Sequence, residues 1–285
     1  MSEYVENYEL ERPSAAEIET LACDENVIKT ITKLQAFQSQ LHASKFITEC
    51  HQSLHPIKPK VSRIRCLALG SPVGSKNALY QLAFLAELAS FLGINEVSVY
   101  DPVFTKTDIY LLENHLKYSV TKGGFGKVQD LETLYFMPHA PLELTQVLLD
   151  SEKPLYFLGN DILAHTDRYT KAKLHDKYET ISLLVHLSED KPKEKSADDF
   201  TPVSRRKKKK NVFVEPEINY DYTNSYLGKL QMTRYKESFK KDSDWGNSFS
   251  DLALHVIEPR LESNRKDDVD ADKKDEETKK STPEL

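Results

Sequence analysis

Short apolar runs alternate with helix-like segments through the middle of this chain, and this alternation restricts the fold more than any other feature. The runs predicted to form strands are residues 64–69, 96–100, 118–120, 133–137, 154–158, 181–187 and 251–257. The segments predicted to form helices between them are residues 77–92, 107–116, 142–149 and 169–177. Strands that alternate with helices in this way indicate βαβ units and a mostly parallel sheet.

The strands also predict that both faces of the sheet are covered. Their apolar residues run continuously instead of alternating with polar ones, which is typical of a parallel sheet buried between two helical layers. Right-handed crossover connections place helices on both faces of such a sheet. We therefore predict an α/β fold, with a Rossmann-like, doubly wound domain over residues 61–257.

Residues 1–60 are predicted to form an N-terminal helical region ahead of the sheet. Apolar residues recur there at helical spacings of three and four, at Ile28, Ile31, Leu34, Phe37 and Leu41. Ser14 and Glu17 have the spacing of a capping box at the start of a helix. Pro56 and Pro59 end the helical pattern, because a proline disfavours helix at the residue before it.

The composition excludes several classes of protein. The chain has 285 residues, a net charge of −6 and three cysteines, which show no CxxC spacing. A disulfide scaffold is therefore excluded, and a reducing compartment is favoured. We find no apolar run of the ~18 residues that a membrane helix needs, and no secretory signal. We expect an intracellular protein without a membrane partner, cytoplasmic, with the nucleus as an alternative location.

Two charged segments are predicted to be disordered. One is an insertion at residues 188–210 that ends in a run of cations at 205–210, and the other is the tail at residues 258–285. The cationic run is interpreted either as a nuclear-localisation or polyanion-binding patch or as a solvated loop. No aromatic residues interleave with the cations and the overall charge is acidic, so we favour the loop and do not expect nucleic-acid binding.

Polar or glycine residues directly follow the ends of several predicted strands. They are Gly70 with Ser71, Asp101, His139, and Gly159 with Asn160. The carboxyl ends of parallel strands meet at one edge of a sheet, and ligands bind there in the crevice where the strand order reverses. With the order 3-2-1-4-5, the loop at residues 70–75 would lie opposite the loop at residues 138–141.

The loop that begins at Gly70 resembles a phosphate-binding turn without matching one. Its pattern, Gly-x-x-x-Gly-Ser-Lys, fits neither the dinucleotide fingerprint nor the P-loop. Ser71, Ser75 and the start of the following helix suit an anion, although a plain strand-to-helix turn is the alternative. Asp101 is placed either to bind ribose hydroxyls or to cap a proline turn.

His139 lies in a loop stiffened by prolines, where it is a candidate general base, metal ligand or hydrogen-bond donor. We predict no metal site, because no His, Cys or Asp cluster with ligand spacing accompanies it. Asn160 either forms a tight turn with Gly159 or directs its amide into the same crevice as His139. His139 is thus the candidate catalytic residue, and no cofactor is assigned.

Taken together, these elements resemble the SRR-like family, named for a plant mutant with reduced sensitivity to red light. The matching elements are Leu69-Gly70-Ser71, the helix at 77–88, Val-Tyr-Asp-Pro-Val-Phe at 99–104, Phe-Met-Pro-His at 136–139, and Leu158-Gly159-Asn160. The chain departs from the family pattern at Ala140, at Asp161-Ile162 and at residues 124–127. The resemblance implies a regulatory role, linked to clock and light signalling in plants, to clock and haem regulation in animals, and to microtubule-related processes in fungi. Of these, the short chain and its lysine-rich insertion favour the fungal type.

Three functional hypotheses follow, in decreasing order of preference. The first is a regulatory protein whose crevice binds a small ligand or serves as a scaffold for protein partners. The second is an enzyme that uses Ser71, Asp101, His139 and Asn160 on a nucleotide-like or adenosylmethionine-like ligand. The third is a polyanion- or tubulin-binding scaffold that acts through residues 205–210 and the charged tail.

Overall fold

The strands in the described part of this protein form a single sheet. The computed structural model describes residues 9–122, 131–189, 217–223, 225–235 and 243–260. The strands are β1 (Arg63–Leu67), β2 (Glu96–Tyr100), β3 (Ser119–Val120), β4 (Thr133–Met137), β5 (Tyr156–Asn160), β6 (Leu227–Arg234) and β7 (Leu252–Pro259). Their order across the sheet is β3-β2-β1-β4-β5-β7-β6. Neighbours from β3 to β5 are parallel, which confirms the predicted α/β fold, and their order is the 3-2-1-4-5 that the sequence left open.

The last two strands extend the sheet with the opposite polarity. β7 pairs antiparallel with β5, with Phe157 opposite His255, and β6 pairs antiparallel with β7. The chain therefore leaves the sheet after β5 and returns to its edge much later in the sequence. This return brings residues just before Leu252 to the carboxyl end of β5, where Asn160 pairs with Leu252.

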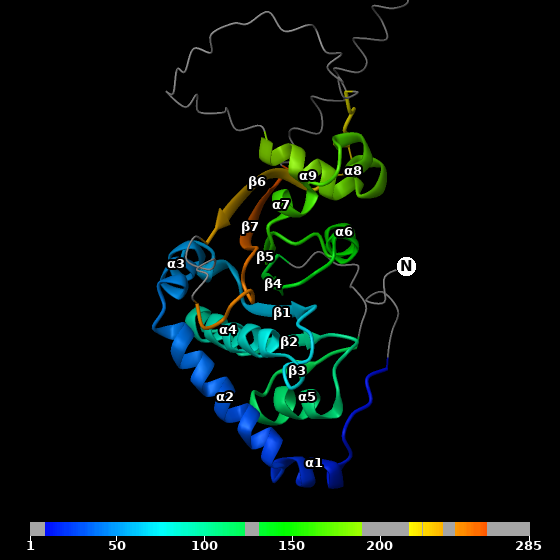
Figure 1. The fold of residues 1–285 in the computed structure, drawn as a ribbon. Helices are drawn as coiled ribbons and strands as arrows, with labels where there is room; N and C mark the ends of the chain where they lie inside the picture. The colour runs from blue at the N-terminus through cyan, green and yellow to red at the C-terminus, as the bar shows by residue number, and fades with distance from the viewer. Residues whose placement is uncertain (1–8, 123–130, 190–216, 224, 236–242, 261–285) are drawn as a thin grey trace, which may run out of the picture.

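Helices cover both faces of the sheet (Figure 1). They are α1 (Ala15–Ala22), α2 (Glu25–His42), α3 (Lys45–Leu54), η1 (Lys58–Lys60), α4 (Lys76–Leu92), α5 (Lys106–Tyr110), η2 (Leu111–His115), α6 (Leu142–Ser151), α7 (Ile162–Thr166), α8 (Lys171–Lys177) and α9 (Glu179–Glu189). Figure 1 shows α2, α3 and α4 on one side of the sheet and α6 on the other. No helix in the described part of the chain is both long and apolar enough to span a membrane.

β4 shows how the sequence produces two cores. All residues of Thr133–Met137 are buried. Leu134 and Phe136 enter the core beneath α4, whereas Tyr135 and Met137 enter the core beneath α6. Successive side chains of a strand point to opposite faces, so a strand between two helical layers must be apolar at every position.

The N-terminal helices pack on α4. Ser14 and Glu17 form the predicted capping box, and Asp24 and Ser44 cap the next two helices, so the helical pattern of residues 17–51 is divided among three helices. Phe37 of α2 stacks on Tyr80 of α4, with ring centroids 3.7 Å apart. Helices α2 and α3 thus share one hydrophobic core with the sheet, whereas α1 buries no residue.

Two strand predictions require correction. Residues 181–187, predicted to be a strand, lie in helix α9, and β6 was not predicted at all. Gly159 and Asn160, predicted to follow the fifth strand, are its last two residues. The cationic run at residues 205–210, the tail from residue 261 onward and the loop at 124–127 lie outside the described residues. Ser188, the predicted start of the insertion, still belongs to α9.

Candidate functional site

Asp101 lies at the carboxyl end of β2 and binds the loop that follows β1. Its side chain is 2% exposed, and its Oδ2 accepts a hydrogen bond from the Gly70 backbone N–H at 2.8 Å. Its Oδ1 accepts from the N–H of Val103 at 3.1 Å. Burial raises the pKa of the Asp101 carboxyl above its ordinary value, although these two backbone donors oppose the shift. Gly70, with φ of 74°, adopts the left-handed conformation that glycine favours.

Ser71 is also held within the protein, by a carboxylate that the sequence analysis did not single out. The Ser71 hydroxyl donates to buried Asp108, at 2.8 Å from Oδ2. Asp108 also accepts from the backbone N–H of Val73 at 2.9 Å and from the hydroxyl of Thr105 at 2.7 Å. Thr105 and Asp108 form the capping box of α5, a Thr-x-x-Asp spacing that was visible in the sequence. Asp108 thus ties the loop after β1 to the start of α5.

Ser75 caps α4 and borders a cavity of about 370 Å³. The cavity lies between the loop at 72–76 and helix α2, and Lys33 and Lys76 contribute ammonium groups to its wall. Gly70 and Ser71 are not among its lining residues, so the predicted ligand loop contributes only its later part. A helix start beside two cations suits an anion, as the sequence predicted for Ser75.

His139 is held by Gln81, a buried polar residue on α4. The Gln81 side-chain nitrogen lies 2.6 Å from Nε2 of His139 and donates a second hydrogen bond to the carbonyl oxygen of Ser248 at 2.8 Å. The Ser248 hydroxyl in turn lies 3.1 Å from Oδ1 of Asn77. Residues from the helix after β1, the loop after β4 and the turn before β7 therefore meet at the carboxyl edge of the sheet.

The Gln81 contact determines the protonation of His139. An amide nitrogen can only donate, so Nε2 of His139 must be the unprotonated acceptor and its proton lies on Nδ1. Partial burial lowers the pKa of His139, and the charge of His165 reinforces the shift while the Asp251 carboxylate opposes it. The exposed imidazole is therefore neutral at physiological pH, with Nε2 engaged by Gln81 and the proton on Nδ1 left to donate.

A histidine–carboxylate pair lies beside His139. Nε2 of His165, on α7, is 2.6 Å from Oδ2 of Asp251, which precedes β7. Burial alone would raise the pKa of Asp251, but the hydrogen bond with His165 and the nearby imidazole of His139 hold it below its ordinary value. The sequence analysis identified neither member of the pair. Residues 165 and 251 are far apart in the sequence, and the antiparallel pairing of β7 with β5 brings them together.

Asn160 joins this group through the loop after β4. Its side-chain nitrogen donates to the carbonyl oxygen of Ala140 at 2.8 Å. The neighbouring Asp161 forms a two-point ion pair with Arg234 of β6. Burial by itself would raise the pKa of Asp161, yet the Arg234 contacts and the backbone donors of α7 keep it low. The Asn160 amide thus lies against the loop that carries His139.

Two buried amide oxygens at this edge lack a hydrogen-bond partner among the described residues. They are Oε1 of Gln81 and Oδ1 of Asn160. A buried acceptor without a donor costs free energy, so native proteins usually pair such atoms with protein, water or ligand. Both amides contact the loop that carries His139 through their nitrogens. Gln81 contacts His139, and Asn160 contacts the carbonyl oxygen of Ala140.

The predicted site residues thus divide into two groups. In the first group, Gly70 is hydrogen-bonded to Asp101, and Ser71 is hydrogen-bonded to Asp108. In the second group, His139 and Asn160 lie near Gln81, Ser248 and Asp251. The loops that carry Ser71 and His139 were predicted to lie opposite each other. No hydrogen bond joins these two residues in the described part of the chain. One feature of the sequence could have indicated Gln81, because it is a polar residue within the apolar face of α4. In the part of the chain that the structure describes, no three His, Cys, Asp or Glu side chains are arranged to hold a metal ion.

Comparison with known proteins places this edge within a family domain. The model of the SRR1 domain matches residues 38–256. A curated protein from Drosophila melanogaster, named SRR1-like protein, is 30% identical over 131 residues. That stretch is 44% of this chain and 48% of the fly protein, so the chain matches about half the length of this relative. No solved structure gives a significant match.

Proposed function

The chain belongs to the SRR1 domain family, and from this premise we propose that it is a regulatory protein that binds a small polar ligand at the carboxyl edge of its sheet. The observation that carries the proposal is the pair of buried, unpartnered amide oxygens on Gln81 and Asn160 beside His139. They lie at the carboxyl edge of the sheet near β1 and β4, the neighbouring strands between which the strand order reverses, and doubly wound sheets bind ligands at such a position.

The unpartnered atoms also indicate the chemistry of the ligand. Each oxygen is an acceptor, and the neutral His139 keeps one proton on Nδ1 to donate. A ligand that presents N–H or O–H groups to the oxygens would remove a penalty of about 1–3 kcal/mol for each. Nucleosides and adenosylmethionine carry such donors in their amino and hydroxyl groups. The periphery of haem carries carboxylates, which match these acceptors less well.

Ligand binding is tested by thermal-shift measurements with nucleotides, adenosylmethionine and haem. We expect at least one of the first two classes to raise the melting temperature of the wild-type chain. Gln81→Leu should abolish that rise, whereas Gln52→Leu, at an exposed position of α3, should leave it intact. If none of the compounds shifts the transition, or if Gln81→Leu responds like the wild type, the ligand proposal is wrong and a pure scaffold is favoured.

The cellular process and location are part of the proposal. By its resemblance to the family, we assign the chain to a microtubule-related process, with clock or haem regulation as alternatives, in the cytoplasm or nucleus. The polyanion- or tubulin-binding alternative depends on residues 205–210, which lie outside the described part of the chain. Neutralising those residues and measuring salt-dependent binding to tubulin would separate the two interpretations.

Catalysis is a second candidate function, favoured by the 2.6 Å contact between His165 and Asp251. A carboxylate beside an imidazole, with a second neutral imidazole nearby at His139, provides groups that can move a proton. Ser71 and Asp101 are less suited to this role than predicted, because internal hydrogen bonds occupy them. A folded His139→Ala variant that fully complements a deletion strain would exclude this function.

A further inference from the structure

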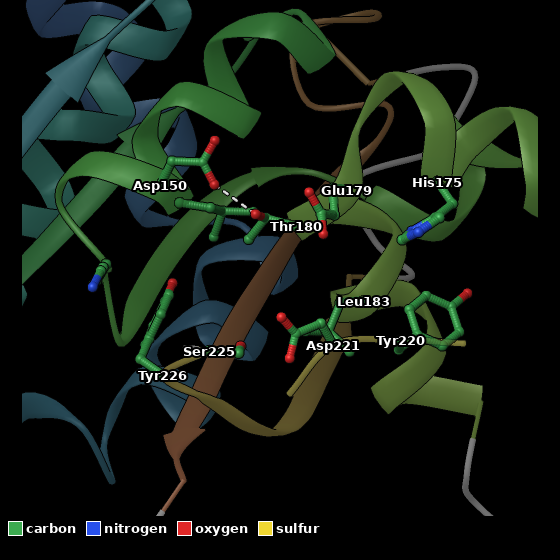
Figure 2. Close-up of a pocket in the computed structure, with 11 residues that line it drawn as sticks. Asp150, His175, Glu179, Thr180, Leu183, Tyr220, Asp221, Ser225 and Tyr226 are labelled. Carbon is green, nitrogen blue, oxygen red and sulfur yellow. Dashed lines mark hydrogen bonds between the residues drawn. The ribbon is translucent and has the colours of Figure 1, made fainter. Parts of the chain in front are cut away.

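A separate polar cavity of about 390 Å³ lies near the amino end of β5, far from the His139 edge along that strand. Its walls come from the end of α6, from α8 and α9, and from Tyr220, Asp221, Ser225 and Tyr226, which precede β6 (Figure 2). Its volume lies within the range of roughly 300–1,000 Å³ that is typical of small-molecule sites.

Negative charge dominates the wall of this cavity. Asp150, Glu179 and Asp221 contribute carboxylates from three separate segments, and Lys153 contributes the single ammonium group among the lining residues (Figure 2). Hydrogen bonds from the side chain and backbone of Thr223 lower the pKa of Asp221, which therefore stays ionised. A carboxylate-rich concave surface raises the local concentration of cations.

The hydrogen-bonding groups of the wall are mostly acceptors. The hydroxyl of Thr180 already donates to Oδ1 of Asp150 at 2.5 Å, and the hydroxyl of Tyr226 donates to the carbonyl oxygen of Pro154. Nδ1 of His175 is buried and has no hydrogen-bond partner among the described residues, and it is a further acceptor when the ring proton lies on Nε2. A complementary ligand must therefore supply N–H donors, and it must be positively charged to match the carboxylates.

Aromatic side chains complete the wall. Tyr220 packs edge-on against His175, with ring centroids 5.4 Å apart, and Tyr226 lies near the amino end of β5 (Figure 2). Burial raises the pKa of Tyr226 well above its ordinary value, so its ring stays neutral. Neutral tyrosine rings attract ammonium and guanidinium groups through the face of the π-system.

We propose that this cavity binds a small organic cation that carries ammonium or guanidinium groups. The carboxylates of Asp150, Glu179 and Asp221 would accept its N–H groups, and the tyrosine rings would pack against its aliphatic part. This site is independent of the ligand site at the carboxyl edge, because the two share no lining or contacting residue.

Calorimetric titration of the whole chain with agmatine and with spermidine tests this proposal. We expect saturable binding of at least one of them, weakened roughly tenfold by Glu179→Gln or Asp221→Asn, the effect of losing one charge-assisted hydrogen bond. Asp176→Asn is the matched control, since Asp176 is an exposed carboxylate of α8 outside the cavity wall. This control should bind as the wild type does.

A second variant separates binding from folding defects. Lys153→Gln removes the cation from the wall, so it should tighten binding severalfold, a gain that misfolding does not produce. The proposal is overturned if neither amine binds, or if Asp176→Asn weakens binding as much as Glu179→Gln does. It is also overturned if magnesium chloride at equal ionic strength gives the same response, because the charges would then attract any cation.

Discussion

The side-chain nitrogen of Gln81 lies 2.6 Å from Nε2 of His139, so a fully buried helical amide controls the protonation of an exposed imidazole in another segment. An amide nitrogen stabilises only the neutral form of its histidine partner. The helix that follows β1 thereby acts on the chemistry of the loop that follows β4.

Replacing this amide with a carboxylate should reverse its effect. Gln81→Glu places an acceptor beside Nε2, which stabilises the imidazolium and raises the pKa of His139 relative to the wild type. NMR titration of the His139 ring resonances measures the change. Gln52→Glu adds the same charge at an exposed position of α3 and should leave the titration unchanged. An unaltered His139 pKa in Gln81→Glu would show that the amide does not control it.

Acid should destabilise the fold through His255. This fully buried residue of β7 stacks on Phe157 with centroids 4.0 Å apart, and burial lowers its pKa from 6.5 to about 4. Between those pH values the unfolded chain binds the proton and the folded chain does not. The free energy of unfolding should therefore fall by about 3 kcal/mol as the pH drops from 6.5 to 4.

The variant His255→Phe isolates this contribution. It keeps the stacking on Phe157 but cannot be protonated, so its unfolding free energy should decline less steeply over the same pH range. Urea denaturation at several pH values measures both curves. Parallel curves for the two proteins would assign the acid sensitivity to other groups.

Asp108 should be the strongest single polar contributor to the loop after β1. Asp108→Asn replaces a carboxylate that accepts from Ser71, Val73 and Thr105 with an amide whose nitrogen cannot accept. We expect a loss of about 2–3 kcal/mol in unfolding free energy, against about 1 kcal/mol for Ser71→Ala. Urea denaturation at neutral pH compares the two, and equal losses would mean that Asp108 acts through Ser71 alone.

Gly159 should tolerate no side chain. A Cβ at this position would lie 2.9 Å from the carbonyl oxygen of Met137 on β4, closer than real contacts allow. Gly159→Ala should therefore cost about 1–3 kcal/mol by pushing β5 away from β4. In the control Gly74→Ala, the new Cβ would lie 3.1 Å from the side-chain oxygen of Ser71, a milder contact, and the melting temperature should fall less.

Local patterns in the sequence were sufficient to predict the central βαβ units. The apolar run of β4 is long, those of β1 and β2 are broken only at Arg65 and Ser98, and α4 begins at a serine cap and ends before Gly93, which has φ of 73°. These signals depend on neighbours in the chain, so they needed no tertiary information.

The errors come from segments whose pattern depends on tertiary packing. Helix α9 packs against α6, α8 and β6, so Ile181, Ser182, Leu183 and Leu184 are all buried. This continuous run of buried residues therefore resembles a buried strand in the sequence, because a short run does not distinguish a strand from a helix. β6 was missed because its buried positions are interrupted by polar ones and by a register shift between Leu227 and Lys229.

The site was predictable only where strand ends defined it. His139 and Asn160 were found because they terminate adjacent strands, β4 and β5. Ser248 and Asp251 could not be found in the same way, since only the pairing of β5 with β7 brings them to this edge. Gly159 was predicted to bind a ligand because it stands at the end of a strand. In the structure, β4 approaches it so closely that a side chain would not fit, which explains why a glycine occupies this position.

The antiparallel return of β7 also sets the time at which the site is completed. Chains emerge from the ribosome with the N-terminus first, and Gln81 and His139 are made long before Ser248 and Asp251. A nascent or cleaved chain that stops before Ser248 lacks the carbonyl that fixes the Gln81 amide and the carboxylate that pairs with His165. The full set of contacts at this edge therefore exists only in chains that extend past Asp251.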